Sequence, residues 1–321
     1  MIEYQITGWL KSTFSYRGTI LPRVLLRVLL FPLITTLLII GRDHSQELSA
    51  ALQLAWLPPL GHSLIGTALG LVLVFRNNAS YDRYWEGRKQ WGGIVNASRN
   101  LARSARSYVG EAKTLAPLVV GFCLALKHQL RGETSGDTLR EHLAEHQVVR
   151  ALKHPNPSLA LNLAMSEWVE HARRSRGLSP ELAQRLEVQV SALMDCQGAC
   201  ERILNTPVPF AHAVHVRQLL FFYLTSLPLV LIPLLGWAAV PTITLIALGL
   251  LGIEEAGVEI EDPFGHDPND LPLSRICDVI SRDVYALVDF DQGVTHEQSL
   301  SDVDESQEDE PQEDEPQEDG Q

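Results

Sequence analysis

The stretch QLLFFYLTSLPLVLIPLLGWAAVPTITLIALGLLGI, residues 218–253, contains no Asp, Glu, Lys or Arg. A bilayer requires about 20 predominantly apolar residues for each transmembrane helix, so this stretch is too long for one span and sufficient for two slightly short ones. The segment from Gly236 to Pro241 favours a tight turn, because Gly and Pro punctuate regular structure. The sequence therefore predicts a helical hairpin with spans at about residues 218–236 and 238–253.

Two further apolar segments precede this hairpin. The first predicted span covers about residues 24–41 and contains one charged residue, Arg27, near its start. The second covers about residues 54–75, lies in an uncharged run and is interrupted early by Pro58-Pro59. The chain is therefore predicted to be an all-α, polytopic membrane protein with four transmembrane helices per subunit.

The distribution of Lys and Arg predicts the orientation of these spans. Basic residues gather before the first span and after the second, whereas the two loops on the opposite side contain only Arg42. The basic residues concerned are Lys11, Arg17, Arg23, Arg27, Arg76, Arg83, Arg88, Lys89, Arg99, Arg103 and Arg106. Because cytoplasmic loops carry the excess of Lys and Arg, we expect both termini in the cytoplasm and the protein in an inner membrane.

The charged regions at residues 76–217 and 254–293 are predicted to form a large set of cytoplasmic helices. Leu118–Leu130 is apolar enough to suggest a fifth span, but Lys127 and His128 interrupt it. A charge within the hydrocarbon region is costly, so a buried cytoplasmic helix is the better interpretation.

A helix start is expected at Ser179-Pro180. Ser is a preferred N-cap and Pro is favoured at the first helical position. This helix is expected to run to about Leu204, and no strand pattern occurs in the middle region.

The net charge of −13 is concentrated at the C-terminus. Eleven acids and no Lys or Arg lie between Asp302 and Asp319, which leaves about −2 for the rest of the chain. This composition predicts a disordered acidic tail at residues 294–321 after a channel-like region at residues 1–293. The absence of a basic excess argues against a nucleic-acid partner.

The four cysteines offer a candidate metal site that their spacing does not support. Cys196 and Cys200 lie four apart, with His212 and His215 downstream, but this spacing matches no common zinc signature. Packing thiols are the better interpretation. No metal, cofactor or catalytic residue is expected, and no nucleophile elbow or phosphate-binding loop supports an enzyme.

Three motifs are more specific than generic membrane sequence. They are FRNNASYDRYWEGRKQWGGIVNASRN at Phe75–Asn100, CERILNTPVPFAH at Cys200–His212 and GIEEAGVEIEDPFGHDPNDLPL at Gly252–Leu273. Their order and their positions beside the spans resemble the bestrophin family, in particular its bacterial branch. The resemblance covers about residues 5–290.

The resemblance implies a homopentameric ion channel with one central pore in a bacterial inner membrane. Its second span lines a narrow apolar neck, and the neck positions transferred to this chain are Thr67, Leu71 and Phe75. Thr67 departs from the bulky apolar residues that the family favours. The resemblance also implies a cytoplasmic aperture at Glu181, or at Leu182 if the alignment shifts by one residue. Glu181 departs from the usual apolar residue, and as an alternative it only favours a helix N-terminus.

The residues of the second span agree with a place beside a pore. Thr67, Leu71 and Phe75 are spaced by four and therefore share one helical face. Gly66 and Gly70 put small residues on other faces, where close helix contact is favoured in membranes. The alternative is that the three neck residues are ordinary lipid-facing or core residues.

Further motif residues are expected to serve the structure. For the charges after the second span, ion pairing is a better interpretation than a direct role in conduction. The same holds for the acidic cluster after the fourth span, although carboxylates could bind calcium. Animal bestrophins have such a site, and here its aspartate run is broken by HDPND at residues 266–270. The structural residues are Arg76, Asn77, Asn78, Asp82, Arg83, Glu86, Glu254, Glu255, Pro263, Phe264 and Gly265.

The leading hypothesis for function is the passive conduction of small monovalent inorganic ions. The family implies chloride conduction by default, and the alternative is a monovalent cation channel of the same architecture. An alternative from another class is a secondary transporter, although internal repeats and matching broken spans are missing. The expected partners are other copies of the chain, membrane lipid and small ions.

Overall fold

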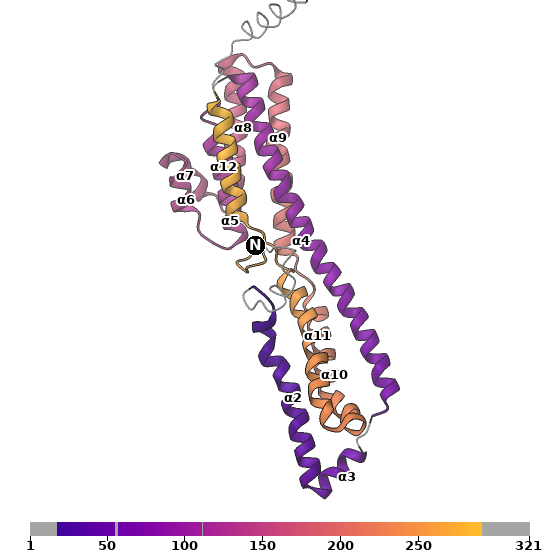
Figure 1. The fold of residues 1–321 in the computed structure, drawn as a ribbon. Coiled ribbons are helices and arrows are strands. Elements are labelled where there is room, and N and C mark those ends of the chain that lie inside the picture. The colour runs from indigo at the N-terminus through magenta and orange to yellow at the C-terminus, as the bar shows by residue number, and fades with distance from the viewer. Residues whose placement is uncertain (1–17, 55–56, 111, 291–321) are drawn as a thin grey trace, which may run out of the picture.

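A computed structural model of the chain describes residues 18–54, 57–110 and 112–290, and it contains no strand within these ranges. The helices form an elongated subunit in which one half contains α2, α3, α10 and α11 and the other contains α5 to α9 and α12 (Figure 1). The long helix α4, Pro59–Val109, runs through both halves. The acidic tail expected at residues 294–321 lies outside the described residues.

The first half is built from apolar helices. These are α2 (Leu21–His44), α3 (Gln46–Leu54), the first part of α4, α10 (Phe210–Leu235) and α11 (Ala239–Glu259). Within the described residues, three helical stretches are long and apolar enough to cross a membrane: α2, α4 and the run Phe210–Glu259 that holds α10 and α11. The short 3₁₀ turn Gly236–Ala238 separates α10 from α11, and Gly236 has a φ of 56°, which Gly adopts without strain.

The second predicted span begins later than expected. α4 starts at Pro59, whereas the residues before it form the separate short helix α3. Pro58 is extended, and Pro59 occupies the first helical position, where its missing N–H costs no hydrogen bond. The Pro58-Pro59 pair therefore marks the start of the helix instead of a break within it.

The second half is a bundle of charged helices around an apolar core. α12 and α9 pack against α4, and α5 packs against α8 and α12. The ranges are α5 (Ala116–Leu130), α6 (Gly136–Arg140), α7 (Glu145–Lys153), α8 (Pro157–Arg176), α9 (Pro180–Asn205) and α12 (Leu273–Asp289). Most of α5 is buried in this core, including Phe122, so the prediction of a buried helix at Leu118–Leu130 is confirmed.

The start predicted for α9 is also confirmed. The Ser179 hydroxyl accepts a hydrogen bond from the Leu182 N–H, and Pro180 is the first helical residue. The helix ends at Asn205, one residue after the predicted end.

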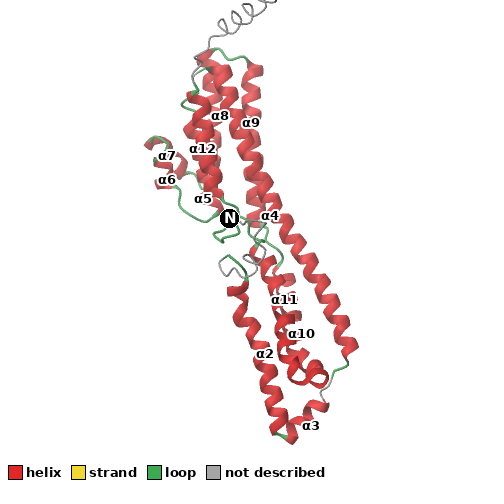
Figure 2. Ribbon diagram, in the orientation of Figure 1, coloured by secondary structure: helices red, strands yellow, loops and turns green. Residues whose placement is uncertain are grey.

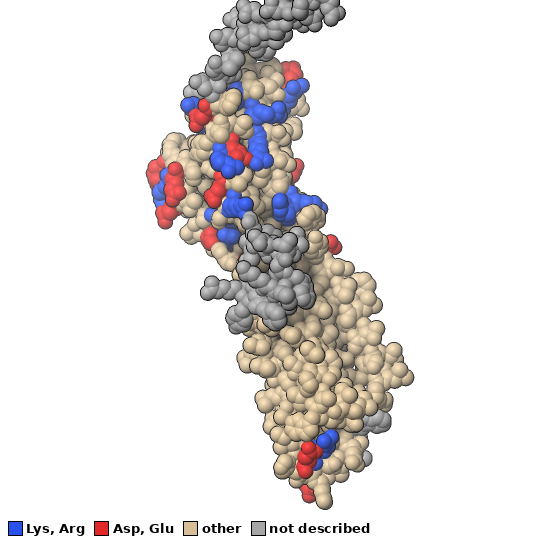
Figure 3. Space-filling view, viewed as in Figure 1, with Lys and Arg blue, Asp and Glu red and all other residues tan. Residues whose placement is uncertain are grey.

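The two halves have different surfaces. Figure 3 shows charged side chains over the half with α8, α9 and α12, and a nearly uncharged surface over the other half apart from a few charges at its far tip. The helix-and-loop view in Figure 2 shows loops gathered where the halves meet and at the two ends. Large apolar side chains such as Leu26 and Leu64 are exposed in the uncharged half, as expected for a surface in contact with lipid.

Candidate functional site

The apolar part of α4 has an exposed face that no other helix covers within the described residues. Thr67, Leu71 and Phe75 lie on it, and the side chains of Leu71 and Phe75 are 56% and 63% exposed. The Thr67 hydroxyl donates to the Ser63 carbonyl at 2.9 Å, so its one donor is satisfied within the helix. We call these three residues with Leu60 and Leu64 the neck face.

The opposite face of α4 is fixed by packing. Leu69 and Leu73 are buried against Val216 and Leu220 of α10. A Cβ at Gly66 would lie 2.5 Å from the Tyr223 hydroxyl oxygen, so a larger residue there would force the tyrosine side chain to move. By contrast, Gly70 has no neighbour at the position of a side chain. Packing against α10 therefore determines which face of α4 remains open.

A buried ion pair follows directly after the neck face. The Arg76 Nη1 donates to Glu254 Oε1 of α11 at 2.8 Å, and both side chains are almost completely buried. The Nε of Arg217 donates to the same oxygen at 3.0 Å, and Arg27 Nη2 donates to Glu255 at 2.5 Å. A carboxylate so deeply buried requires such partners, because removing a charge from water costs several kcal/mol. The motif residues Arg76, Glu254 and Glu255 therefore join α4 to α11, and Glu255 joins α11 to α2.

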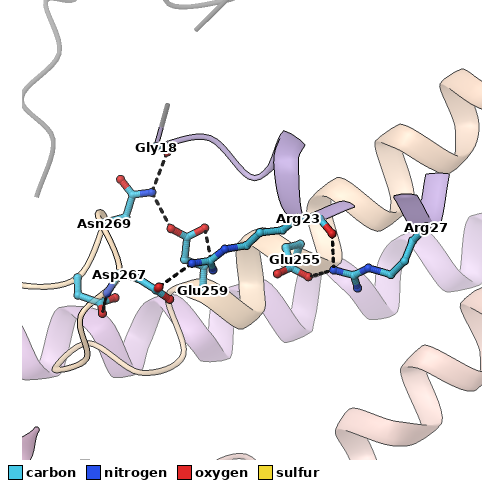
Figure 4. A network of polar contacts seen from close by, with 8 residues as sticks. Gly18, Arg23, Arg27, Glu255, Glu259, Asp267 and Asn269 are labelled. Atoms are coloured by element: carbon cyan, nitrogen blue, oxygen red, sulfur yellow. Dashed lines mark hydrogen bonds and ion pairs between the residues drawn. The ribbon is translucent and has the colours of Figure 1, made fainter. Parts of the chain in front are cut away.

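A second ion-pair network secures the start of α2 to the loop after α11 (Figure 4). Arg23 donates to Asp267 at 2.6 Å and lies 3.7 Å from Glu259. Asn269 donates both to Glu259 and to the carbonyl of Gly18. These contacts hold the N-terminal end of the first span against the loop at the junction of the two halves.

Arg83 joins three segments at the same junction. Its guanidinium donates to the carbonyls of Ile203 and Thr206 at the C-terminal end of α9, at 2.7 and 2.6 Å. It also donates to the Glu261 carbonyl after α11 at 3.1 Å. A cation is stabilised at a helix C-terminus, where carbonyls lack helical partners. Arg83 therefore connects α4 to the end of α9 and to the segment after α11.

The other polar residues of the motif at Phe75–Asn100 make fewer contacts with the rest of the subunit. Glu86 is 2.6 Å from Lys89 and accepts from Gln90, and these contacts lower its pKa. Asn78 and Asp82 are exposed and have no hydrogen-bond partner within the described residues. Asn78 follows Phe75 by three residues and Asp82 follows Asn78 by four, so both extend the open face of α4 beyond the neck face.

The loop after α11 packs into the apolar core of the charged half through Phe264. This side chain is fully buried, and a side chain at Gly87 of α4 would approach it and Pro263 at 3.1 Å. A side chain at Gly265 would lie 2.7 Å from Asp270 Oδ2. The motif Pro263-Phe264-Gly265 is therefore matched to a glycine on α4. Asn77 fills the space beside Gly257 of α11, and its buried side-chain amide oxygen has no hydrogen-bond partner among the residues that the structure describes.

The acidic residues near this loop interact mainly with arginines and with backbone N–H groups. No group of three or more His, Cys, Asp or Glu within the described residues has a metal-binding arrangement. Asp270 Oδ2 accepts from the Asp267 N–H at 2.7 Å. Burial, followed by the nearby charges of Asp267, Asp262 and Glu259, raises the pKa of Asp270 to about 6.

The two residues predicted for a cytoplasmic aperture lie in the first turn of α9, which begins at the end of the charged half far from the apolar half (Figure 1). Glu181 is exposed, and hydrogen bonds from its own backbone N–H and from Ser179 lower its pKa. Leu182 is partly buried against the core, so Glu181 is the more exposed of the two.

A family model described as "Bacterial/Fungal Bestrophin protein" matches residues 1–286. The chain belongs to the bacterial and fungal bestrophin family. The resemblance read from the three sequence motifs is thereby confirmed.

Named relatives and solved structures that are similar to this bestrophin agree with that family. A "voltage-dependent anion channel-forming protein" of Nostoc is 35% identical over 287 residues, covering 86% of this chain and 90% of the relative. A protein of the same description from Escherichia coli K12 is 31% identical and covers 88% and 92% of the two chains. The crystal structure of a bestrophin homologue from Klebsiella pneumoniae matches with a TM-score of 0.78 and 30% identity, covering 83% of this chain and 98% of that one.

Three partners of the buried carboxylates in this bestrophin were not predicted from the sequence. Arg23 and Arg27 served there only to orient the first span, and Arg217 only marked the end of the middle region. All three are charges at the ends of apolar helices, where an ionisable residue by default indicates a functional or paired site. That signal predicts a partner for each arginine without indicating which carboxylate it is.

Proposed function

We propose that this bestrophin is one subunit of a homopentameric channel that conducts monovalent ions passively through a central pore. The pore is lined by the neck face of α4, with Leu71 and Phe75 as its narrowest apolar positions. Each subunit contributes four transmembrane helices, α2, the first part of α4, α10 and α11. Both termini and the charged half lie on the cytoplasmic side of a bacterial inner membrane.

The observation that carries this proposal is the continuity of the open face of α4. The exposed positions run from Thr67, Leu71 and Phe75 directly to Asn78 and Asp82. A purely lipid-facing stripe would be expected to end with the apolar residues, whereas a pore wall continues into a water-filled vestibule. A ring of subunits with this face toward one axis gives both an apolar constriction and a polar exit.

Anion conduction is the expected default. The named relatives are described as forming voltage-dependent anion channels, and they are similar to this chain over most of its length. An apolar neck does not select by charge, so selectivity depends on charged rings elsewhere. Glu181 at the far end of α9 favours the alternative of a cation-selective channel, because five carboxylates around one exit would concentrate cations.

The test is current recording from the purified protein in a planar bilayer with unequal KCl concentrations on the two sides. Resolvable unitary currents support a channel, whereas a secondary transporter turns over too slowly to produce them. The sign of the reversal potential then separates chloride conduction from potassium conduction. Native mass spectrometry of the same preparation tests the number of subunits, and a stable species other than a pentamer would contradict the assembly proposed.

A further inference from the structure

A groove of about 200 Å³ lies between α2, α10 and α11, close to the junction of the apolar and charged halves. Its walls include Leu30, Phe221 and Leu251, and its polar end contains Arg27, Arg217 and Glu254. Leu30 and Phe221 are both substantially exposed. The groove therefore has apolar walls along its length and two arginines at one end.

The charges at this end are layered, with the cations outside and the carboxylates inside. The side chains of Arg27 and Arg217 are 46% and 53% exposed, whereas those of Glu254 and Glu255 are only 1% and 10% exposed. Arg217 uses its Nε for Glu254, and its two terminal nitrogens make no further hydrogen bond within the described residues. The surface of the groove consequently presents guanidinium N–H groups.

The groove opens on a different side of the subunit from the neck face. No residue of α4 lines it. In Figure 1, α2 and α4 lie on opposite flanks of α10 and α11. If the neck face points to the pore axis, the groove points toward the surrounding lipid.

We propose that this groove binds an anionic phospholipid of the cytoplasmic leaflet. The phosphate of the headgroup lies between Arg27 and Arg217, and an acyl chain lies along Leu30 and Phe221. Guanidinium groups bind phosphate oxygens through short charge-assisted hydrogen bonds, and basic pockets between transmembrane helices on the cytoplasmic side suit anionic headgroups. The choice of leaflet and the outward direction of the groove rest on the orientation and pore proposed above.

Arg217→Gln is the variant that tests the site, because Glu254 keeps Arg76 as a partner at 2.8 Å. The purified oligomer is exchanged in detergent with mixtures of phosphatidylglycerol and phosphatidylcholine, and bound lipid is counted by native mass spectrometry. The wild type is expected to retain phosphatidylglycerol in preference. Removing one cation near a membrane surface weakens anionic lipid binding about fivefold. Arg217→Lys should retain most of the binding.

The matched control is Arg174→Gln, which removes an exposed arginine from α8 in the charged half and should leave lipid retention unchanged. Equal retention of the two lipids by the wild type, or undiminished phosphatidylglycerol on Arg217→Gln, would overturn the proposal. Oligomer size by gel filtration shows that each variant is assembled. Because binding is counted without any current, a failure of this site and a failure of the channel proposal are distinguishable.

A second measurement separates lipid from a neighbouring subunit as the occupant. Leu30 is replaced by the photo-crosslinker p-benzoylphenylalanine, and the protein is irradiated in vesicles that contain phosphatidylglycerol. The expected product is a single subunit with the mass of one lipid added. A covalent dimer in its place would mean that a second copy covers the groove, and the lipid site would be rejected.

Discussion

Arg76 of α4 and Glu254 of α11 form a 2.8 Å ion pair although they are 178 residues apart in sequence. Their side chains are 2% and 1% exposed. A pair buried to this extent adds little stability in comparison with apolar residues of the same volume, but the loss of one partner leaves an uncompensated charge. The pair therefore fixes the rotation of α4 just where its open face changes from apolar to polar.

The first prediction is that Arg76→Gln destabilises the subunit by about 3–5 kcal/mol, as expected when one partner of a buried pair is removed. The measurement is the thermal unfolding midpoint of the purified protein, with assembly followed by gel filtration. Arg42→Gln is the control, because Arg42 pairs with the exposed Asp43 and should change stability by less than about 1 kcal/mol. Equal effects of the two changes would contradict a special role for the buried pair.

The second prediction concerns the neck face. Leu71→Ala should raise conductance or open probability, because a wider apolar constriction dewets less readily. Single-channel recording measures the change, and cysteines at positions 71 and 75 should react with a water-soluble thiol reagent. Leu29→Ala, on the exposed surface of α2, should leave currents unchanged. Wild-type currents in Leu71→Ala, together with unreactive cysteines, would place this face in lipid.

The third prediction is that Glu181→Gln lowers the permeability of cations relative to anions, and that the change is larger at low salt because screening is weaker. The lowered pKa of Glu181 keeps the carboxylate ionised at neutral pH, and acid should reproduce the mutant only below the ordinary pKa range of a glutamate. Reversal potentials provide the measurement, with the exposed Glu141→Gln as control. An unmoved reversal potential at low ionic strength would limit Glu181 to a role at the helix N-terminus.

The fourth prediction is a pH-dependent gain in stability for Asp270→Asn. The pKa of Asp270 is raised to about 6 in the fold from its ordinary value of 3.8, so the native state binds its proton more tightly than the unfolded chain. The free energy of unfolding therefore falls as pH rises from about 4 to about 6, and the variant should gain about 1–3 kcal/mol over wild type at pH 7. An asparagine oxygen can still accept from the Asp267 N–H.

Thermal unfolding at pH 4.5 and pH 7 measures this gain, which should be larger at pH 7. Asp137→Asn, at a fully exposed carboxylate, should show no such difference. If calcium raises the unfolding temperature of the wild type and chelation reverses it, while Asp270→Asn does not respond, the carboxylate binds a metal and the prediction is wrong.

The fifth prediction is that truncation after Gly293 leaves the oligomer intact, because a segment with twelve acids and no Lys or Arg cannot bury enough apolar surface to offset chain entropy. Gel filtration and native mass spectrometry measure assembly. A longer truncation that also removes α12 is the contrast, since Ile280 and Val284 are fully buried in the core of the charged half. Loss of the oligomer in the shorter truncation would assign a structural role to the tail.

The sequence determined the features of this bestrophin that depend on local chemistry. An uncharged run can avoid the cost of exposing apolar side chains only in lipid or in a core, so the apolar spans were readable without the fold. The start of α9 was equally predictable, because the Ser179 cap and Pro180 at the first helical position act on backbone groups only a few residues away. The family motifs added the neck positions, which the structure places on one open face.

The tertiary structure decided what depends on contacts between distant segments. Nothing in the local sequence indicates that Glu254 accepts from Arg76 and Arg217 at once, or that Gly87 is small because Phe264 packs against it. Such pairings depend on how the helices rotate and cross. The sequence alone offers several arginines near the ends of the apolar segments as partners for each carboxylate. Burial makes the choice, because a charge withdrawn from water is stable only where its partner is already positioned by the packing of both helices.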